Sequence, residues 1–352
     1  MKGNKTLYLF EGIACLLVVL IHNPFPGDLG IFFVSIARYA VPLFFMVSGY
    51  SLYGCLETDI YREKIKRRLK KNSKVLGIAI ACYFVFDIAK CMLKGRSVFQ
   101  HFAEMISIPN VFRLVFLGLF PPQSACGILW FMLAQLYVYV FAIIFASKTK
   151  KCIIPTITKI SFFALLFASC LKIFSTALHW KVGIIDLSSS WIYGNWILMG
   201  LPCFFLGIGF ADYFEKNHHK VVLFSIPGYM VVIGVCIILN YILCLILDHQ
   251  LKMYLNQTAF TLIMDYCMFA IAQQDRISEK NLFAKIGCFH SRNVYIAHPA
   301  IISCYNIIFE KIPSTNWIGY VQPVLVIITS LVFSMILNII VRQTNNYKAR
   351  RA

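Results

Sequence analysis

The stretch IACLLVVLIHNPFPG, Ile13 to Gly27, decides the fold class. A run of apolar residues leads to a histidine, His22, and two prolines and a glycine follow within five residues. Such a run is typical of a helix that crosses a membrane, and Pro and Gly mark its end. An imidazole at the end of a span has two interpretations: it marks the membrane boundary, or it carries out chemistry there.

The whole chain resembles this stretch in composition. Of its 352 residues, 59% are hydrophobic and only 14% are charged, and the mean hydropathy is +0.73. Soluble domains are rarely more than about half apolar. Apolar runs of roughly 20 residues, the length that crosses a bilayer, recur along the chain. We therefore predict an all-α, polytopic membrane protein with about ten transmembrane helices.

The apolar runs and their charged flanks place these ten spans. They cover Leu7–Ile21, Ile31–Leu52, Val75–Leu93, Ile128–Ser147, Ile160–Leu178, Trp191–Phe210, Val221–Leu247, Ala259–Ala272, Leu282–Phe309 and Tyr320–Val341. Alternation puts both termini on the side that holds most Lys and Arg, which the positive-inside rule assigns to the cytoplasm. Residues Val98–Phe120 mix apolar and charged positions, which favours a helix in the outer interface. The sequence predicts a membrane domain over residues 1–345 and a short basic cytoplasmic tail over residues 346–352.

Charge and cysteine usage argue against other classes of function. The net charge of +18 is gathered in short clusters between the apolar runs, which indicates membrane topology and not nucleic-acid binding. The 13 cysteines are scattered singly without a C-x-x-C pair, so the sequence predicts neither a zinc site nor a redox motif. No metal and no permanently bound cofactor are expected.

Ionisable residues inside the spans are the candidate functional residues, because each is costly in lipid unless it is paired or faces a wet cavity. Glu11 and His22 are eleven residues apart, close to three helical turns, so they share one face of the first helix about 16 Å apart. His22 lies about 22 Å along its helix and His298 about 24 Å along the ninth, so we expect the two to converge in the outer third of the membrane. Imidazole exchanges protons near neutral pH. The structural alternative is an interfacial or hydrogen-bonded histidine, with the ring of His298 closing a kink ahead of Pro299.

Two cationic features complete the set of candidates. Arg38, in ARYAVPLFFMVSGYSL, lies inside the predicted second span and needs an anionic or carbonyl partner, for instance the carboxylate of Asp265 or Asp87. The predicted loop REKIKRRLKKNSK, Arg62 to Lys74, holds eight Lys or Arg in thirteen residues. Its two interpretations are a topological and lipid-binding anchor, or a grip on the phosphates of a soluble anionic donor.

Four motifs follow one another along the chain: LFEGIACLLVVLIH, ARYAVPLFFMVSGYSL, GILWFMLAQLYVYVF and SRNVYIAHP. In this order they resemble the acyltransferase-3 family of integral-membrane acyltransferases. The resemblance implies about ten helices and transfer of an acyl group, commonly acetyl from cytoplasmic acetyl-CoA, to a hydroxyl of a surface glycan or related acceptor. It implies His22 as general base or transient acyl carrier, with His298 and Arg38 orienting groups or stabilising the oxyanion.

One position departs from the pattern of this family. The family's proposed catalytic pair is an arginine eleven positions before a histidine. The histidine matches His22. The arginine, which is expected to contact the donor, is replaced by Glu11 in this chain. A carboxylate cannot grip donor phosphates, so either the donor is held elsewhere or the activity is altered. The family's basic motif, which implies a site for the phosphates of coenzyme A, matches loosely within Lys66, Arg67, Arg68, Lys70 and Lys71.

The predicted function is that of a membrane O-acetyltransferase in a bacterial plasma membrane. Acyl-CoA is the expected donor substrate, and a surface carbohydrate or lipid-linked molecule is the expected acceptor. The alternative is a non-catalytic transporter or ligand-binding domain of the same fold, which Glu11 favours. A polysaccharide flippase or polymerase is a third interpretation, although such proteins usually have more spans or large outer loops. The sequence does not reveal the acceptor, the acyl chain or the oligomeric state.

Overall fold

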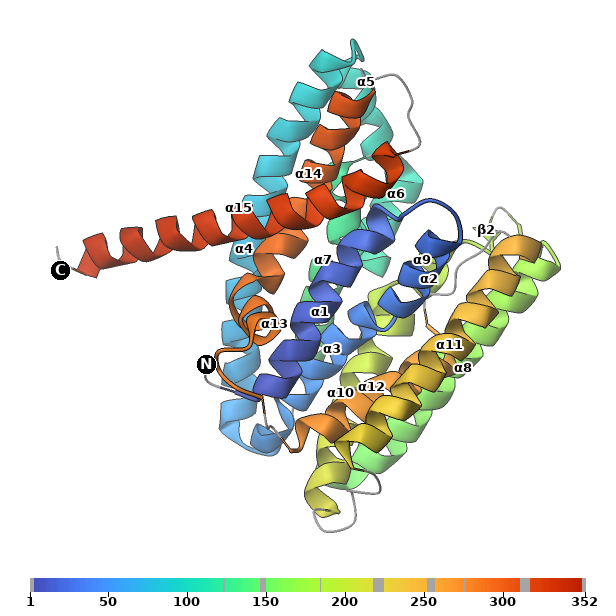
Figure 1. Cartoon of the computed structure of the whole chain (residues 1–352), viewed down its shortest axis with the longest axis vertical. Helices are drawn as coiled ribbons and strands as arrows, with labels where there is room; N and C mark the ends of the chain where they lie inside the picture. Colours follow the sequence, from blue (N-terminus) through green and yellow to red (C-terminus); the bar gives the residue numbers. More distant parts are fainter. Residues whose placement is uncertain are drawn as a thin grey trace. The chain divides into compact units, whose positions relative to one another are not determined.

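The structure is a computed structural model of the chain, and it describes residues 3–122, 124–145, 150–183, 185–217, 225–251, 257–274, 277–310 and 317–349. Their regular structure is almost entirely helical (Figure 1). Two short strands, β1 (Lys181–Val182) and β2 (Ile185–Asp186), pair as an antiparallel ribbon. The predicted all-α class is confirmed.

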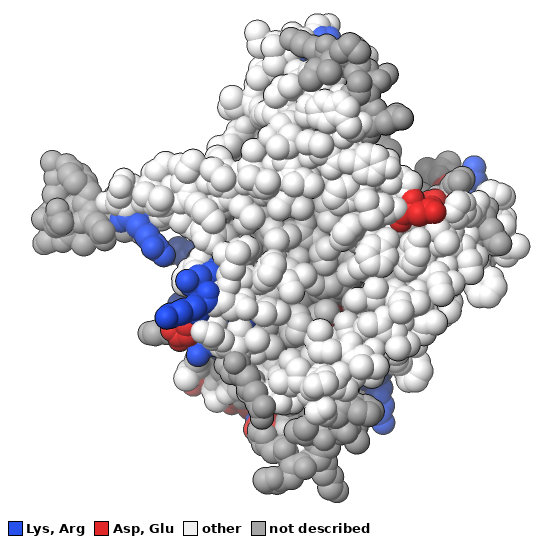
Figure 2. Space-filling view, viewed as in Figure 1, with Lys and Arg blue, Asp and Glu red and all other residues white. Residues whose placement is uncertain are grey.

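Eight helical segments of the described residues are long and apolar enough to cross a membrane. They contain α1 (Lys5–His22), α2 and α3 (Gly27–Ala37 and Ala40–Tyr50), α4 (Asp59–Leu93), α7 (Trp130–Ile144), α8 (Ile154–Ala177), α10 (Leu201–Lys216), α11 (Ile226–Leu251) and α15 (Ile318–Ala349). On the face drawn in Figure 2, charged side chains are few and occur in small groups, as expected for a surface in contact with lipid. The chain is a polytopic membrane protein.

The two remaining predicted spans take other forms. Helix α12 (Ala259–Ala272) has the predicted limits, and at 14 residues it is shorter than the eight segments above. The ninth predicted span consists of α13 (Leu282–Lys285), a π-helical turn η7 (Ile286–His290) and α14 (Ser291–Phe309). This span is therefore interrupted by a π turn that ends at His290. The count of ten spans and the cytoplasmic side of the termini stay predictions.

Two predicted regions differ in detail from the structure. The second span, predicted over Ile31–Leu52, lies within one candidate span, Gly27–Cys55, but its helix is interrupted at Arg38 and Tyr39. Pro42 explains the break, because it has no N–H for the Arg38 carbonyl four residues earlier and its ring would clash with that carbonyl. The basic stretch, predicted as a loop, is the first half of α4. Lys, Arg and Glu are strong helix formers and no proline interrupts α4, so the helix extends through the charges.

The segment predicted to lie in the interface forms short helices. These are α5 (Val98–Met105), α6 (Ile108–Phe112) and a π turn, η2 (Arg113–Leu117). Phe99 and Ile108 are 85% and 86% exposed. Short helices with exposed apolar side chains suit a membrane surface, in agreement with the predicted role.

The chain divides into two compact units. The first consists of Met1–Ala37 and Asp275–Ala352, and the second of Arg38–Gln274. The first unit brings the two ends of the chain together: α1, blue in Figure 1, packs against α13, η7 and α14, which are orange. The second unit contains α3 to α12, with the short helix α9 (Ser190–Tyr193) and the π turn η6 (Trp196–Gly200) before α10.

Glycines allow the helices of the second unit to approach closely. A Cβ atom at Gly49 would overlap the carbonyl oxygen of Phe204, and one at Gly207 would overlap that of Met46. Helices α3 and α10 therefore cross with their backbones in contact. Gly49 belongs to the motif ARYAVPLFFMVSGYSL, and its small size allows this close approach.

Candidate active site

The crossing of α1 with the α13–α14 segment fixes the geometry of the first unit. A Cβ at Gly12 would overlap the carbonyl oxygen of Phe283, and a Cβ at Gly287 would overlap that of Tyr8. Each glycine thus faces the backbone of the other helix, and no larger residue fits at either position without separating the two. This pair of contacts is called the glycine crossing below.

The glycine crossing also sets the relative height of the two candidate histidines. His22 lies ten residues beyond it along α1, and His298 lies eleven residues beyond it along η7 and α14. At 1.5 Å per residue both are about 15 to 16 Å from the crossing. Between these points, the thiol of Cys15 donates a hydrogen bond to the Ser291 carbonyl, 3.3 Å away. The two histidines are therefore level because the helices are in register at the glycines.

His22 and His298 lie in contact. Their ring centroids are 5.5 Å apart and the ring planes are inclined by 30°. Tyr295 also contacts His298, with its ring centroid 5.7 Å from that of His298. His298 is fully buried, whereas His22, the last residue of α1, is half-buried. The convergence predicted from helix depth is confirmed, and it places an accessible imidazole against an enclosed one.

The hydrogen bonds of His298 indicate its tautomer. Its Nδ1 lies 3.3 Å from the carbonyl oxygen of Val294. A carbonyl only accepts, so Nδ1 carries the proton and Nε2 presents its lone pair. Nε2 is buried and has no hydrogen-bond partner among the described residues. An imidazole held through Nδ1 with an open Nε2 is an arrangement suited to proton transfer.

The same contact agrees with the structural interpretation of YIAHP. Pro299 has no N–H to bond the Tyr295 carbonyl, so the turn before it is the place where a kink is expected. The ring of His298 contacts the carbonyl of Val294 in that turn. The contact with Val294 therefore fits both interpretations of His298.

Glu11 lies on the same face of α1 as His22, as predicted. Helix α1 is continuous from Lys5 to His22, so the eleven-residue offset keeps both side chains on one face about 16 Å apart. The Glu11 carboxylate lies within electrostatic reach of the thiols of Cys15 and Cys288. One of these thiols belongs to α1 and the other to η7, and a thiol does not bind phosphate.

Arg38 begins the second unit, in the turn before α3. It lies within electrostatic reach of Lys172 on α8. Of its two predicted partners, Asp87 accepts hydrogen bonds from the Ser124 hydroxyl, at 2.8 Å, and from the Ala125 N–H. Asp265 is fully buried, and neither of its carboxylate oxygens has a hydrogen-bond partner among the described residues. A hydrogen-bonded pair of Arg38 with Asp265 is therefore not formed.

The basic stretch of α4 divides into two groups of side chains. Arg68 is half-buried and donates from Nη1 to the Ser48 carbonyl, at 3.2 Å, and to the Ser51 hydroxyl, at 2.9 Å. Lys64 donates to the Ser51 carbonyl at 3.0 Å. These cations bind carbonyls at the C-terminal end of α3, where positive charge is stabilising.

Three further cations of the stretch are exposed to solvent. Lys66, Arg67 and Lys71 are exposed, and Lys66 forms an ion pair with Glu63 at 3.1 Å. Arg67 and Lys71 line an open groove on α4 together with Ile60, Lys64 and Arg68. Of the predicted donor-binding residues, Arg67 and Lys71 are thus the best placed to receive an anion from solution.

Sequence reasoning missed a polar network behind this groove. Gln135 of α7 donates to the Ser48 hydroxyl at 2.6 Å and accepts from Asn72 of α4 at 3.3 Å. The Tyr139 hydroxyl also lies 3.5 Å from that of Ser48. Two of these residues stand in GILWFMLAQLYVYVF, where a lone Gln in an apolar run was the available signal. The network joins α3, α4 and α7 at the level of the basic stretch.

Nearly the whole chain matches one family model, which is described as an acyltransferase domain and covers residues 5–342. The chain belongs to the acyltransferase-3 family. The match includes both histidines, Arg38 and the basic stretch. No curated protein and no solved structure is significantly similar to the chain. Membership of the acyltransferase-3 family identifies a membrane acyltransferase as the general activity. In the described part of the chain, no three His, Cys, Asp or Glu side chains lie close enough together to hold a metal ion.

Proposed function

We propose that this acyltransferase-3 member is an O-acetyltransferase that moves acetyl from cytoplasmic acetyl-CoA to a hydroxyl of a surface glycan or lipid-linked acceptor. The thioester bond of the donor breaks and an ester bond to the acceptor oxygen forms. The acceptor proton passes to an imidazole and then to the departing coenzyme A thiolate, so that the enzyme is unchanged after one cycle.

The observation that carries this proposal is the contact between His22 and His298. His22 is the half-buried member of the pair, so it is the one that an acceptor hydroxyl can approach, and it acts as general base. His298, held through Nδ1, packs against His22 and keeps its ring in place. Only one of two imidazoles in contact carries an added proton at a time, because a second positive charge beside the first is repelled.

The donor is proposed to bind through its phosphates at the groove on α4. The exposed Arg67 and Lys71 supply the charge, and guanidinium and ammonium groups are the usual partners of phosphate oxygens. Arg68 is proposed to hold the groove in place through its bonds to the end of α3. Arg38 is proposed to stabilise charge that develops on the thioester oxygen.

The second candidate function is binding or transport of a ligand without chemistry. The observation that favours it is Glu11, which stands at the family's arginine position and lies beside two thiols. The two candidates differ in one measurable respect: a transporter retains labelled acetyl-CoA or acceptor without consuming the thioester.

The experiment that tests the proposal is replacement of His22 in cells whose surface glycan is analysed by mass spectrometry. We expect His22→Ala to remove the acetyl groups that depend on this protein, with the protein level in membranes unchanged. His179→Asn is the matched control, because His179 is exposed and its positive φ of 48° is tolerated by Asn. Acetylation that persists in His22→Ala, at wild-type protein level, would contradict catalysis by His22.

A further inference from the structure

A series of polar side chains joins α15 to α14 and to the end of η7 within the first unit. Near the start of α15, the Gln322 amide donates to the Asn306 side chain at 2.6 Å. Further along α15, the Asn338 amide donates to His290 Nδ1 at 3.1 Å, and the Ser334 hydroxyl lies 3.0 Å from the same nitrogen. These bonds, called the polar ladder below, show that α14 and α15 run antiparallel, and they fix the register of the two helices.

Ser330 stands in the middle of the polar ladder on α15. It follows Gln322 by eight residues and precedes Asn338 by eight. Residues four apart form one ridge of a helix, so Ser330 and Ser334 lie on the ridge that Gln322 begins. Both serines are fully buried. Ser330 therefore lies on the face of α15 that packs against the rest of the first unit.

The residue at the same height on α14 is His298. It precedes Asn306 by eight residues, just as Ser330 follows Gln322 by eight, so both lie about 12 Å from the bond between Gln322 and Asn306. Helices α14 and α15 are packed together, and in Figure 1 α15, red, crosses α14, orange. The polar ladder thus places the Ser330 side chain level with the fully buried imidazole of His298.

Both side chains carry a buried polar atom without a partner. Neither His298 Nε2 nor the Ser330 hydroxyl has a hydrogen-bond partner among the described residues, so the two are not bonded to each other. Nε2 only accepts, because Nδ1 carries the proton, whereas a hydroxyl donates and accepts. Buried polar groups of this kind are costly unless a third group satisfies them. A water molecule can donate to Nε2 and bind the hydroxyl at the same time.

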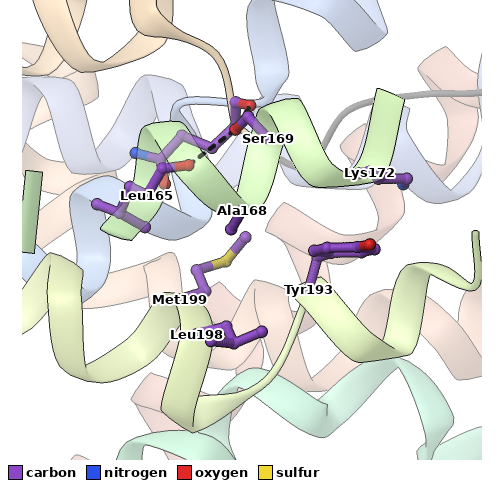
Figure 3. A pocket seen from close by; sticks show the side chains of 8 residues that line it. Leu165, Ala168, Ser169, Lys172, Tyr193, Leu198 and Met199 are labelled. Atoms are coloured by element: carbon purple, nitrogen blue, oxygen red, sulfur yellow. Dashed lines mark hydrogen bonds between the residues drawn. The ribbon is translucent and has the colours of Figure 1, made fainter. Parts of the chain in front are cut away.

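A cavity in the second unit shows the same combination of features. In Figure 3 it lies between α8, which carries Lys172, and the side chains of Tyr193 and Met199. Its volume is about 20 Å³, which is room for about one water molecule. Gln257 also lines it, and the buried Nε2 of this amide has no hydrogen-bond partner among the described residues. In this cavity, an unpartnered buried nitrogen adjoins a space for one water.

We propose that Ser330 is a positioning residue for the histidine pair: its hydroxyl binds one water molecule, and this water donates to Nε2 of His298. The Val294 carbonyl holds the imidazole through Nδ1 and the water holds it through Nε2, so the ring is fixed at both nitrogens. A ring fixed in this way stays packed against His22. The proposal rests on the proposed function, because it gives Ser330 a role in positioning the general base.

The test combines ¹⁵N NMR of the full chain, labelled at histidine in lipid nanodiscs, with kinetics of acetyl transfer. Ser330→Ala leaves the water with too few polar partners to be retained. The Nε2 resonance of His298, assigned by its loss in His298→Asn, should therefore move downfield, because a lone pair that accepts a hydrogen bond resonates upfield of a free one. We expect kcat to fall about tenfold, as for loss of one hydrogen bond, and KM for acetyl-CoA to stay within about twofold. Thr329→Val is the matched control and should change neither, because the Thr329 hydroxyl donates to the Leu325 carbonyl of α15 itself at 2.7 Å.

Two results would overturn the proposal. One is an unchanged Nε2 resonance in Ser330→Ala, which is informative even if the wild-type protein transfers no acetyl, since the NMR signal does not depend on acyl transfer. The other is a wild-type kcat in Ser330→Ala when His22→Ala is inactive, because His22 would then be the base without help from Ser330. Failure of the proposed function itself looks different, as a folded wild-type protein without transferase activity. Alanine favours helix and is smaller than serine, so Ser330→Ala is expected to fold, which its melting temperature checks.

Discussion

The substitution Gly12→Ala tests whether the glycine crossing sets the position of His22. The added Cβ would overlap the Phe283 carbonyl oxygen, whereas ordinary contact requires 3.4–4 Å. The obstacle is backbone and cannot rotate away, so α1 must separate from α13 by about 1 Å or more. The same displacement is carried along α1, a continuous helix, to His22 at its end.

The expected loss of activity follows from this displacement. A misplacement of about 1 Å in a catalytic group costs about 10²-fold in rate, equivalent to about 2.7 kcal/mol in the activation barrier. Overpacking also lowers stability by about 1–3 kcal/mol, so the assay is run at a temperature at which the variant is folded. The measurement is kcat for release of coenzyme A thiol from acetyl-CoA in the presence of acceptor-containing membranes.

Gly234→Ala is the matched control, because a Cβ at Gly234 on α11 meets nothing within 4 Å. We expect Gly234→Ala to retain wild-type kcat and Gly287→Ala, on the other side of the crossing, to behave like Gly12→Ala. The reasoning is refuted if folded Gly12→Ala retains kcat within twofold of wild type, since the crossing would then not position the imidazole.

Three further predictions concern single side chains. Arg67→Ala should raise KM for acetyl-CoA at least tenfold with an unchanged melting temperature. Arg68→Ala should instead lower stability by about 1 kcal/mol, because it removes the cap at the end of α3. Kinetics and thermal unfolding are measured on both variants, and the assignment of Arg67 to donor binding and Arg68 to the cap would be contradicted if the effects were reversed. Glu11→Gln should change KM for acetyl-CoA less than twofold, because a carboxylate does not bind donor phosphates; a tenfold rise would show that Glu11 acts in donor binding. Hydrogen bonds from the Ser188 hydroxyl and N–H hold the pKa of Asp186 below its ordinary value, so the stabilisation they give is present at neutral pH and is lost as pH falls through the lowered pKa. Ser188→Ala should therefore reduce the acid dependence of thermal unfolding below about pH 5, and an identical pH profile for both proteins would refute the assignment.

The sequence predicted the elements whose signals are local. Helix α12 was predicted within its observed limits from its apolar run, and in the structure Thr258 caps it through a capping box with Thr261. The phase and length of α1 were predictable because its apolar run is uninterrupted up to His22, and helix depth alone was enough to bring His298 level with it. The position of a residue along a helix follows from the rise per residue, and the start of a helix follows from its capping residue. Both can be read from the sequence.

Two errors arose from local signals that were weighted wrongly. Pro42 stands four residues after Arg38, the spacing at which proline removes a helical hydrogen bond, but no interruption was predicted inside the second span. The charges of Arg62 to Lys74 were taken as a loop, although Lys, Arg and Glu favour helix. Lys172 was also passed over, although a lysine in an apolar run was visible.

The remaining features depend on contacts between distant parts of the chain. Gly12 and Gly287 contact each other's helices from opposite ends of the sequence, and nothing local identifies either as the partner of the other. The sequence also does not show which cations of the basic stretch cap α3 and which are exposed. Arg67 and Arg68 are adjacent, and only the direction in which α4 presents each side chain distinguishes them. Register and helix face at long range are set by packing, which sequence periodicity does not specify.

The central claim is that His22 is the general base of an acetyl transfer. It is tested most directly by incubating purified wild-type and His22→Ala protein in lipid nanodiscs with radiolabelled acetyl-CoA and cell-envelope glycan. Wild type should transfer label to the glycan and release coenzyme A in equal amounts, and His22→Ala should lose at least 10²-fold in rate, as expected for removal of a general base. Transfer by His22→Ala at the wild-type rate, or retention of intact acetyl-CoA by a folded wild-type protein that transfers nothing, would contradict the account.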